Sequence, residues 1–175
     1  MATITMPLPG AAWQSTSDVT NWASAQAQVK QSSGTVPSPR WIEWLFDAGT
    51  DEFVVVSFVV PGNYVSTPTL DILYKSTADT AGTIGFEARI AAVTPADATD
   101  LDAMAFDTAA INAATGIVPA TAGHIASITI TLTNNDSMAA GDFVVFALNR
   151  NVSADTSAQI SADVEFVAAD FQYST

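Results

Sequence analysis

Three strand-like segments decide the fold of this chain: ASITITLT (126–133), FVVFALNR (143–150) and ADVEFVAADFQYS (162–174). In the first segment, isoleucine and leucine alternate with threonine, which is typical of a strand with one buried and one solvent-facing side. The second segment is apolar from Phe143 to Leu148, as expected of a strand covered on both faces. Polar turns containing Asn, Asp and Gly separate the segments, so we expect three consecutive β-strands.

The last of these strands cannot keep one register along its whole length. Val164, Phe166 and Ala168 follow a period of two, whereas Phe171 and Tyr173 fall on the opposite parity. A β-bulge near residues 168–170 would return the two aromatic side chains to the buried face. The sequence therefore predicts a bulge at that point.

Similar apolar runs occur upstream, at residues 41–46, 53–60, 69–75 and 83–91. The first two flank a turn at 47–51 and are interpreted as a hairpin with a longer loop. No helix of suitable length lies between the strands, which argues against parallel βαβ architecture. The pattern predicts an all-β fold, an antiparallel β-sandwich or jelly roll of about eight strands with an N-terminal arm or short helix.

The length of 175 residues and a hydrophobic content of 49% indicate one domain with a packed core. We expect residues 1–40 to form an N-terminal arm or connector and residues 41–175 to form the β-sandwich domain. Ser17 or Asp18 could cap a short helix in the arm. Trp13 and Trp22 have two possible roles: packing on the domain's own core, or docking as interface residues on a neighbouring subunit.

The charge balance excludes several partners. The chain has 18 acidic and 5 basic residues and a net charge of −13, so it lacks the cations needed to bind nucleic acid or an anionic membrane. Without cysteine it has neither disulfides nor thiolate metal sites. The segment MATITMPLPG does not resemble a secretory signal, and no apolar run approaches the length of a membrane span.

Catalytic chemistry is hard to find in this sequence. His124 is the single histidine, and without a G-x-S-x-G motif it is interpreted as a structural or surface residue. Carboxylates that a glycosidase could use are present, but no spacing indicates a cleft. These are Glu43, Glu52, Glu87 and Glu165. The prediction is a protein that is not an enzyme and has no cofactor.

The irregular stretch 93–122 contains an acidic group whose oxygen atoms calcium would favour as ligands. Its members are Asp97, Asp100, Asp102 and Asp107. Their spacing does not match an EF-hand, so no metal site is predicted and calcium remains an open alternative. In the strand at 41–46, Trp41 and Trp44 point to opposite faces. We expect one in the core and the other on a covered flank, the alternative being a platform for sugar rings.

The second half of the chain also carries a resemblance. The segments are SITITLT, AGDFVVFALNR and DVEFVAADFQYS, preceded by VPGNY, PTLDILYKS and GFEARI. Their order, over roughly residues 41–173, resembles β-sandwich structural proteins of tailed bacteriophages, most like capsid decoration (cement) proteins. The resemblance implies a homo-oligomer, often a trimer, that is made in the host cytoplasm and binds the major capsid protein on the virion surface. It brings no catalytic residues.

The first functional hypothesis is therefore a non-enzymatic virion protein that binds and stabilises a phage capsid lattice. The alternative is a carbohydrate-binding or receptor-binding β-sandwich module of a tail or fibre. An exposed Trp41, Trp44 or Tyr64 on one sheet face would favour this alternative. A third hypothesis, an enzyme acting on polysaccharide, requires two carboxylates at catalytic separation in a groove.

Overall fold

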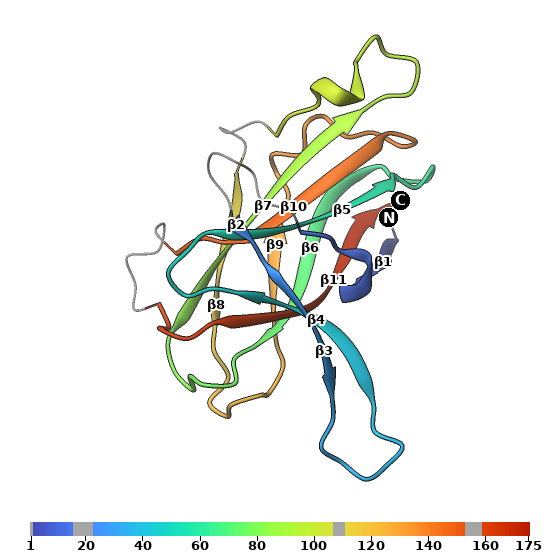
Figure 1. Ribbon diagram of the computed structural model, residues 1–175. Helices are drawn as coiled ribbons and strands as arrows, with labels where there is room; N and C mark the ends of the chain where they lie inside the picture. Colours follow the sequence, from blue (N-terminus) through green and yellow to red (C-terminus); the bar gives the residue numbers. More distant parts are fainter. Residues whose placement is uncertain (1, 16–22, 107–110, 153–158) are drawn as a thin grey trace.

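Two β-sheets packed face to face form the computed structural model, which describes residues 2–15, 23–106, 111–152 and 159–175 (Figure 1). Sheet A contains β1 (Thr3–Pro9), β3 (Gln26–Gln31), β4 (Arg40–Phe46), β6 (Ser66–Lys75), β9 (Ala126–Thr131) and β11 (Val164–Ser174). Sheet B contains β2 (Ala23–Ser24), β5 (Glu52–Val59), β7 (Thr83–Val93), β8 (Asn112–Ile117) and β10 (Phe143–Arg150). Two short 3-10 helices, η1 (Gly10–Ala12) and η2 (Leu101–Ala103), complete the described elements. The predicted all-β sandwich is confirmed.

Strands that follow one another in sequence often lie in different sheets. Sheet A has the order β3-β4-β11-β6-β9, with β1 also paired to β11, and sheet B has the order β2-β5-β10-β7-β8. The strands β9, β10 and β11 accordingly alternate from A to B and back to A. The predicted hairpin at 41–60 is wrong, because β4 belongs to sheet A and β5 to sheet B. Crossing between sheets lets each strand turn an apolar face to the shared core.

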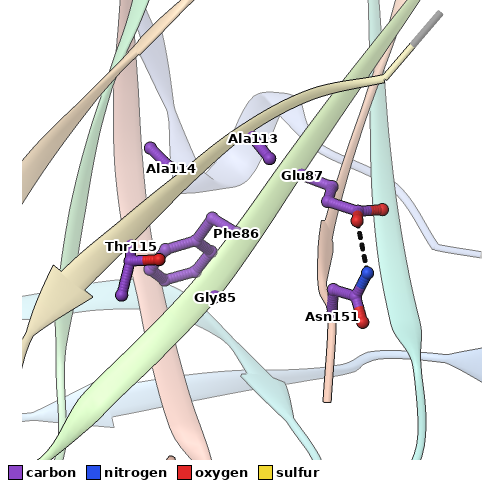
Figure 2. A pocket seen from close by; sticks show the side chains of 7 residues that line it. All are labelled: Gly85, Phe86, Glu87, Ala113, Ala114, Thr115 and Asn151. Carbon is purple, nitrogen blue, oxygen red and sulfur yellow. Dashed lines mark hydrogen bonds between the residues drawn. The ribbon is translucent and has the colours of Figure 1, made fainter. Parts of the chain in front are cut away.

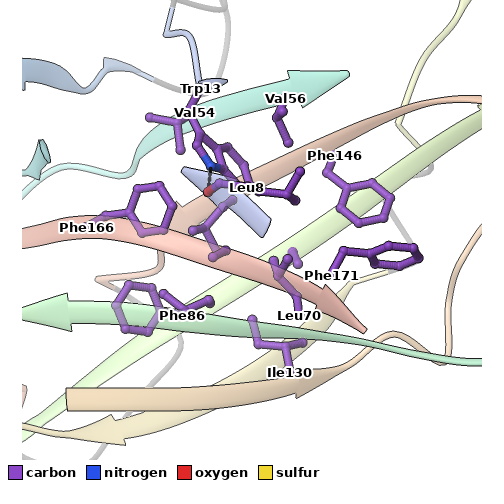
Figure 3. Packing of buried hydrophobic residues seen from close by; sticks show 14 of the residues in the cluster. Leu8, Trp13, Val54, Val56, Leu70, Phe86, Ile130, Phe146, Phe166 and Phe171 are labelled. Carbon is purple, nitrogen blue, oxygen red and sulfur yellow. Dashed lines mark hydrogen bonds between the residues drawn. The ribbon is translucent and has the colours of Figure 1, made fainter. Parts of the chain in front are cut away.

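The core follows from strand alternation. Leu70, Ile130, Phe86 and Phe146 point inward from four different strands and are almost completely buried (Figure 3). In β11 the register against β6 shifts between Phe166 and Ala168. This confirms the predicted bulge, although it lies just before the expected residues 168–170. Because of this shift, the aromatic side chains on both sides of the bulge lie in the core.

The N-terminal residues are part of the sandwich, and the expected arm must be corrected. Strand β1 pairs along β11 from Thr3, opposite Ser174, to Pro9, opposite Ala168. Strand β1 pairs with β11 on one side only. It therefore tolerates prolines, because no second strand needs a hydrogen bond from the N–H that proline lacks. Together with β2 and β3, β1 brings the number of described strands to eleven, compared with the predicted eight or so.

Trp13 lies in the chain's own core. It is 2% exposed, its Nε1 donates to the Leu8 carbonyl oxygen at 3.1 Å, and its ring meets Phe166 edge-on with centroids 5.1 Å apart (Figure 3). This placement matches the alternative of packing on the domain's own core. The interface role for Trp13 must be corrected, because its side chain has almost no surface left for a neighbouring subunit. Trp22 and the helix expected after Ser17 or Asp18 lie outside the described residues.

Arg150 closes one end of the sandwich. It ends β10, is fully buried, and donates to the carbonyl oxygens of Ala162 and Ile160 at 2.8 Å each. Weaker bonds reach the carbonyl oxygens of Phe46 and Asp47. The guanidinium therefore ties together the ends of strands from both sheets.

Candidate binding site on the outer face of sheet A

The strands of sheet A alternate, so the face opposite the core receives polar side chains from three neighbours. In β4, Trp44 points into the core, whereas Trp41 and Glu43 point outward. Glu165 of β11 is paired with Lys75 of β6, which places both on the same outer face. Strand β11 lies between β4 and β6, so side chains from the three strands can meet above it.

An ion network occupies the centre of this face. Lys75 Nζ lies 3.0 Å from Glu43 Oε2 and 4.0 Å from Glu165 Oε1. Lys30, from β3, places its Nζ 3.3 Å from Glu43 Oε1. Glu43 is 0% exposed although it lies on the outer side of the sheet, because its neighbours cover it. Both lysines of the chain thus converge on one carboxylate.

Two further hydrogen bonds fix the network. Trp41 Nε1 donates to Glu43 Oε2 at 2.8 Å, and Thr77 Oγ1 donates to Glu165 Oε1 at 2.7 Å. The indole of Trp41 is therefore held in one orientation by a buried carboxylate, while part of the ring remains exposed. A ring held in this way needs little further ordering when a ligand binds.

A cavity of about 570 Å³ lies beside Trp41. We call it the Trp41 cavity; its lining residues come from the β3–β4 hairpin, the sheet and the turn before β9. They are Gln31, Ser32, Ser33, Trp41, Lys75, Gly123, Ile125 and Val167. This combination of apolar walls and a few polar groups, at this volume, is typical of small-molecule binding sites.

The three aromatic residues that the sequence offered as a sugar platform separate in the structure. Trp44 and Tyr64 belong to the buried core, and Trp44 Nε1 donates to the Gly10 carbonyl oxygen at 2.9 Å. Of the three, Trp41 lines the cavity on the outer face. The pair of tryptophans on β4 is thus divided as expected, with one in the core and one on a flank.

Of the four candidate glutamates, the structure brings only Glu43 and Glu165 together. Lys75 lies within 4.0 Å of both, and both are buried, so their charges are balanced internally. A glycosidase instead needs one carboxyl group free to protonate the leaving group and the other facing the sugar. Glu52 lies near Asp47 and Asp163, and Glu87 lies on sheet B.

Glu87 borders a second, smaller cavity of about 120 Å³ between β7 and β8. Figure 2 shows the side-chain amide of Asn151 donating to the Glu87 carboxylate at its edge. The remaining lining comes from Gly85, Phe86 and residues 113–115. Its volume is below the usual range of ligand sites, so we regard the Trp41 cavity as the stronger candidate.

The other sequence candidates are dispersed. His124 is exposed in a turn, where its backbone N–H donates to the Thr121 carbonyl oxygen. Asp100 accepts a hydrogen bond from the Asp102 backbone N–H at the start of η2, and Asp107 lies outside the described residues. Within the described ranges, no three His, Asp or Glu side chains are placed to hold a metal ion. The helices of those ranges are also too short to cross a membrane.

The sequence did not point to the ion network or the cavity. The two lysines and two glutamates come from four strands, and no local motif links them. The only signal was the alternation in β4, which separates Trp41 from Trp44. The lining residues of the hairpin and of the 119–125 turn look like ordinary polar connectors in the sequence.

Comparisons with known proteins identify solved structures with a similar fold. No protein-family model and no curated protein sequence matches the chain. Among solved structures, it is similar to the Clostridium thermocellum xylanase 10B CBM22-1-GH10 modules complexed with xylohexaose, with a TM-score of 0.50 and 10% identity. That match covers 99% of this chain and 28% of the xylanase chain.

Two further similar structures are carbohydrate-binding modules of the same organism. The family 11 module of cellulase Lic26A-Cel5E has a TM-score of 0.49 and 12% identity, over 98% of this chain and 95% of the module. The family 11 module in complex with a β-1,3-1,4-mixed-linked tetrasaccharide has a TM-score of 0.48 and 12% identity, over 95% and 94% of the two chains. At these identities the likeness concerns the fold: the chain is a β-sandwich of the jelly-roll kind.

Proposed function

We propose that this chain is a carbohydrate-binding β-sandwich that takes a glycan in the Trp41 cavity. The observation that carries the proposal is the partly exposed Trp41 indole, held by the buried Glu43 carboxylate at the edge of a cavity of about 570 Å³. Sugar rings present apolar C–H faces together with hydroxyl groups. A flat indole next to amide and hydroxyl side chains matches both features.

The polar lining supports the same ligand class. Gln31 supplies an amide, and Ser32 and Ser33 supply hydroxyl groups that can both donate and accept hydrogen bonds. Ile125 and Val167 provide apolar walls. The xylanase 10B modules that share the fold are complexed with xylohexaose. Because that likeness concerns the fold, the proposal depends on the cavity itself.

A glycan array probed with the purified chain, followed by calorimetry on the best ligand, tests this proposal. We expect Trp41→Ala to lower the affinity by about tenfold or more, as for other aromatic anchors of binding sites. Val59→Ala, at an exposed position on sheet B, is the control and should bind like the wild type. Equal binding by wild type and Trp41→Ala would exclude the cavity as the glycan site.

The capsid decoration protein is a second candidate, favoured by the β3–β4 hairpin. Figure 1 shows this hairpin projecting away from the sandwich. Val29 and Val36 on it are 74% and 79% exposed, and residues 26–40 contain Lys30 and Arg40 but no acidic residue. The hairpin thus exposes apolar side chains and has no acidic residue, although the whole chain carries a charge of −13. These are features of a surface that binds another protein, and for this candidate the partner is the major capsid protein.

The native mass by light scattering and co-sedimentation with emptied phage heads test this second candidate. We expect a trimer that pellets with the shells at a fixed ratio, and Val29→Ser/Val36→Ser should reduce the pelleted fraction. The Trp41→Ala variant separates the two candidates, because its loss of glycan binding should leave sedimentation unchanged. A monomer that stays wholly in the supernatant would remove the capsid role.

A further inference from the structure

The charges around the Trp41 cavity cancel one another. Lys30 and Lys75 bring two positive charges, and Glu43 and Glu165, which they contact, bring two negative charges. The sum over this network is therefore zero. Lys75 lines the cavity but is only 7% exposed, so its ammonium group is engaged with the carboxylates and offers little charge to a ligand.

The nearest arginine in sequence faces elsewhere. Arg40 precedes Trp41 in β4, so alternation directs their side chains to opposite faces of the strand. The other polar side chains of the cavity, those of Gln31, Ser32 and Ser33, are uncharged. An anionic ligand would thus find no unbalanced cation among the lining residues.

Beyond the cavity, the same face of sheet A is acidic. Asp71 of β6 and Asp170 of β11 are direct cross-strand partners, and both alternate with core residues, so both face outward. Thr129 and Gln172 donate hydrogen bonds to the Asp71 carboxylate and extend a row of hydroxyl and amide groups along the sheet. This surface can bond to hydroxyl groups, but together with the net charge of −13 it repels carboxylates and sulfates.

We infer that the ligand of the Trp41 cavity is a neutral glycan, built from uncharged sugars and free of uronate or sulfate groups. This inference rests on the proposed carbohydrate-binding function and specifies its ligand class. Recognition then depends on the Trp41 ring and on hydrogen bonds from uncharged groups. Binding should consequently depend little on ionic strength.

The test compares polysaccharides that differ only in charge. Glucuronoxylan, polygalacturonate and alginate are immobilised beside their carboxyl-reduced forms, with neutral xylan and mixed-linked β-glucan on the same array. Where a polysaccharide binds, we expect the reduced form to bind about tenfold tighter or better than its parent, because like charges oppose the parent. Affinity for the best neutral ligand should change by less than about twofold between about 50 and 500 mM NaCl.

A gain-of-function variant ties this preference to the cavity. Ser33→Lys adds one uncompensated cation to the rim, where Ser33 is exposed, and should leave the fold intact. The loss of the Ser33 hydroxyl acts on neutral and charged glycans alike, so the readout is the ratio of uronate binding to neutral binding, which should rise by about fivefold or more. Wild-type preference for the uronate forms would overturn the inference and leave carbohydrate binding standing. Binding to none of the polysaccharides, in either form, would overturn the proposed function and this inference together.

Discussion

Lys75 and Glu43 form a buried ion pair across β11, with 3.0 Å between Nζ and Oε2, although their own strands, β6 and β4, do not pair with each other. The pair lies on the outer face of sheet A, where charged side chains are ordinarily solvated. The Trp41 indole donates to the same oxygen, and Lys30 forms an ion pair with the other oxygen of the Glu43 carboxylate.

Replacement of Lys75 should show how much the buried Glu43 carboxylate destabilises the fold without this cation. In Lys75→Met the Glu165 carboxylate loses its ion pair with Lys75, and Glu43 keeps only its ion pair with Lys30. We therefore expect a loss of about 3–5 kcal/mol in the free energy of unfolding. Urea denaturation measures this. Lys30→Met is the matched control; its partly exposed ammonium should contribute about 1 kcal/mol or less. Equal losses in the two variants would contradict a buried network centred on Lys75.

Gly10 should tolerate no side chain. A Cβ at this position would lie 2.5 Å from the carbonyl oxygens of both Ile42 and Val167, which are backbone atoms of β4 and β11. Gly10→Ala must therefore separate η1 from sheet A, and we expect a loss of about 1–3 kcal/mol or more. Gly62→Ala is the control, since nothing lies within 4 Å of its added Cβ. Thermal unfolding should show a clear drop for the first variant and almost none for the second.

Arg150 should not be replaceable even by another cation. In Arg150→Met the carbonyl oxygens of Ile160 and Ala162 lose their donors, each at about 1–3 kcal/mol. Arg150→Lys keeps the charge but cannot reproduce the forked donor, so an intermediate loss is expected. Hydrogen exchange of residues 159–164 should accelerate in both variants. Unchanged exchange there would show that the guanidinium does not hold this segment.

Glu52 should make stability depend on pH. Burial raises the pKa of Glu52 above its ordinary value of 4.5. A hydrogen bond from the Asp47 backbone N–H opposes this rise, and the negative charges of Asp47 and Asp163 add to it. The folded protein therefore holds this proton more tightly than the unfolded chain. The resulting stability is fully present below about pH 4.5 and is lost as the pH rises through the folded-state pKa.

Glu52→Gln removes this titration but keeps an oxygen that can accept from Asp47. We expect the melting temperature of the wild type, relative to this variant, to fall as the pH rises from about 4 to about 7. Melting curves of both proteins at several pH values give this difference directly. A difference that grows with pH would show that the carboxylate is stabilised by folding, contrary to the expected shift.

Much of the fold follows from local pattern. Alternation along β9 identified its inward side chains, and the parity change between Phe166 and Phe171 identified the bulge in β11. The N-terminal region is where local pattern misled. Its strands are short or contain prolines, and β1 is held mainly by pairing with the distant β11, which no local signal records.

The sequence by itself determined an all-β sandwich, because alternating apolar residues need a shared core whichever strands become neighbours. It also determined that Trp41 and Trp44 face opposite ways, since the side chains of a strand alternate. Only the tertiary structure decided that β4, β11 and β6 lie side by side, and hence that two lysines, two glutamates and Trp41 meet beside one cavity. The reason is physical: strand order depends on contacts between residues far apart in the chain, which the period of a single segment does not encode.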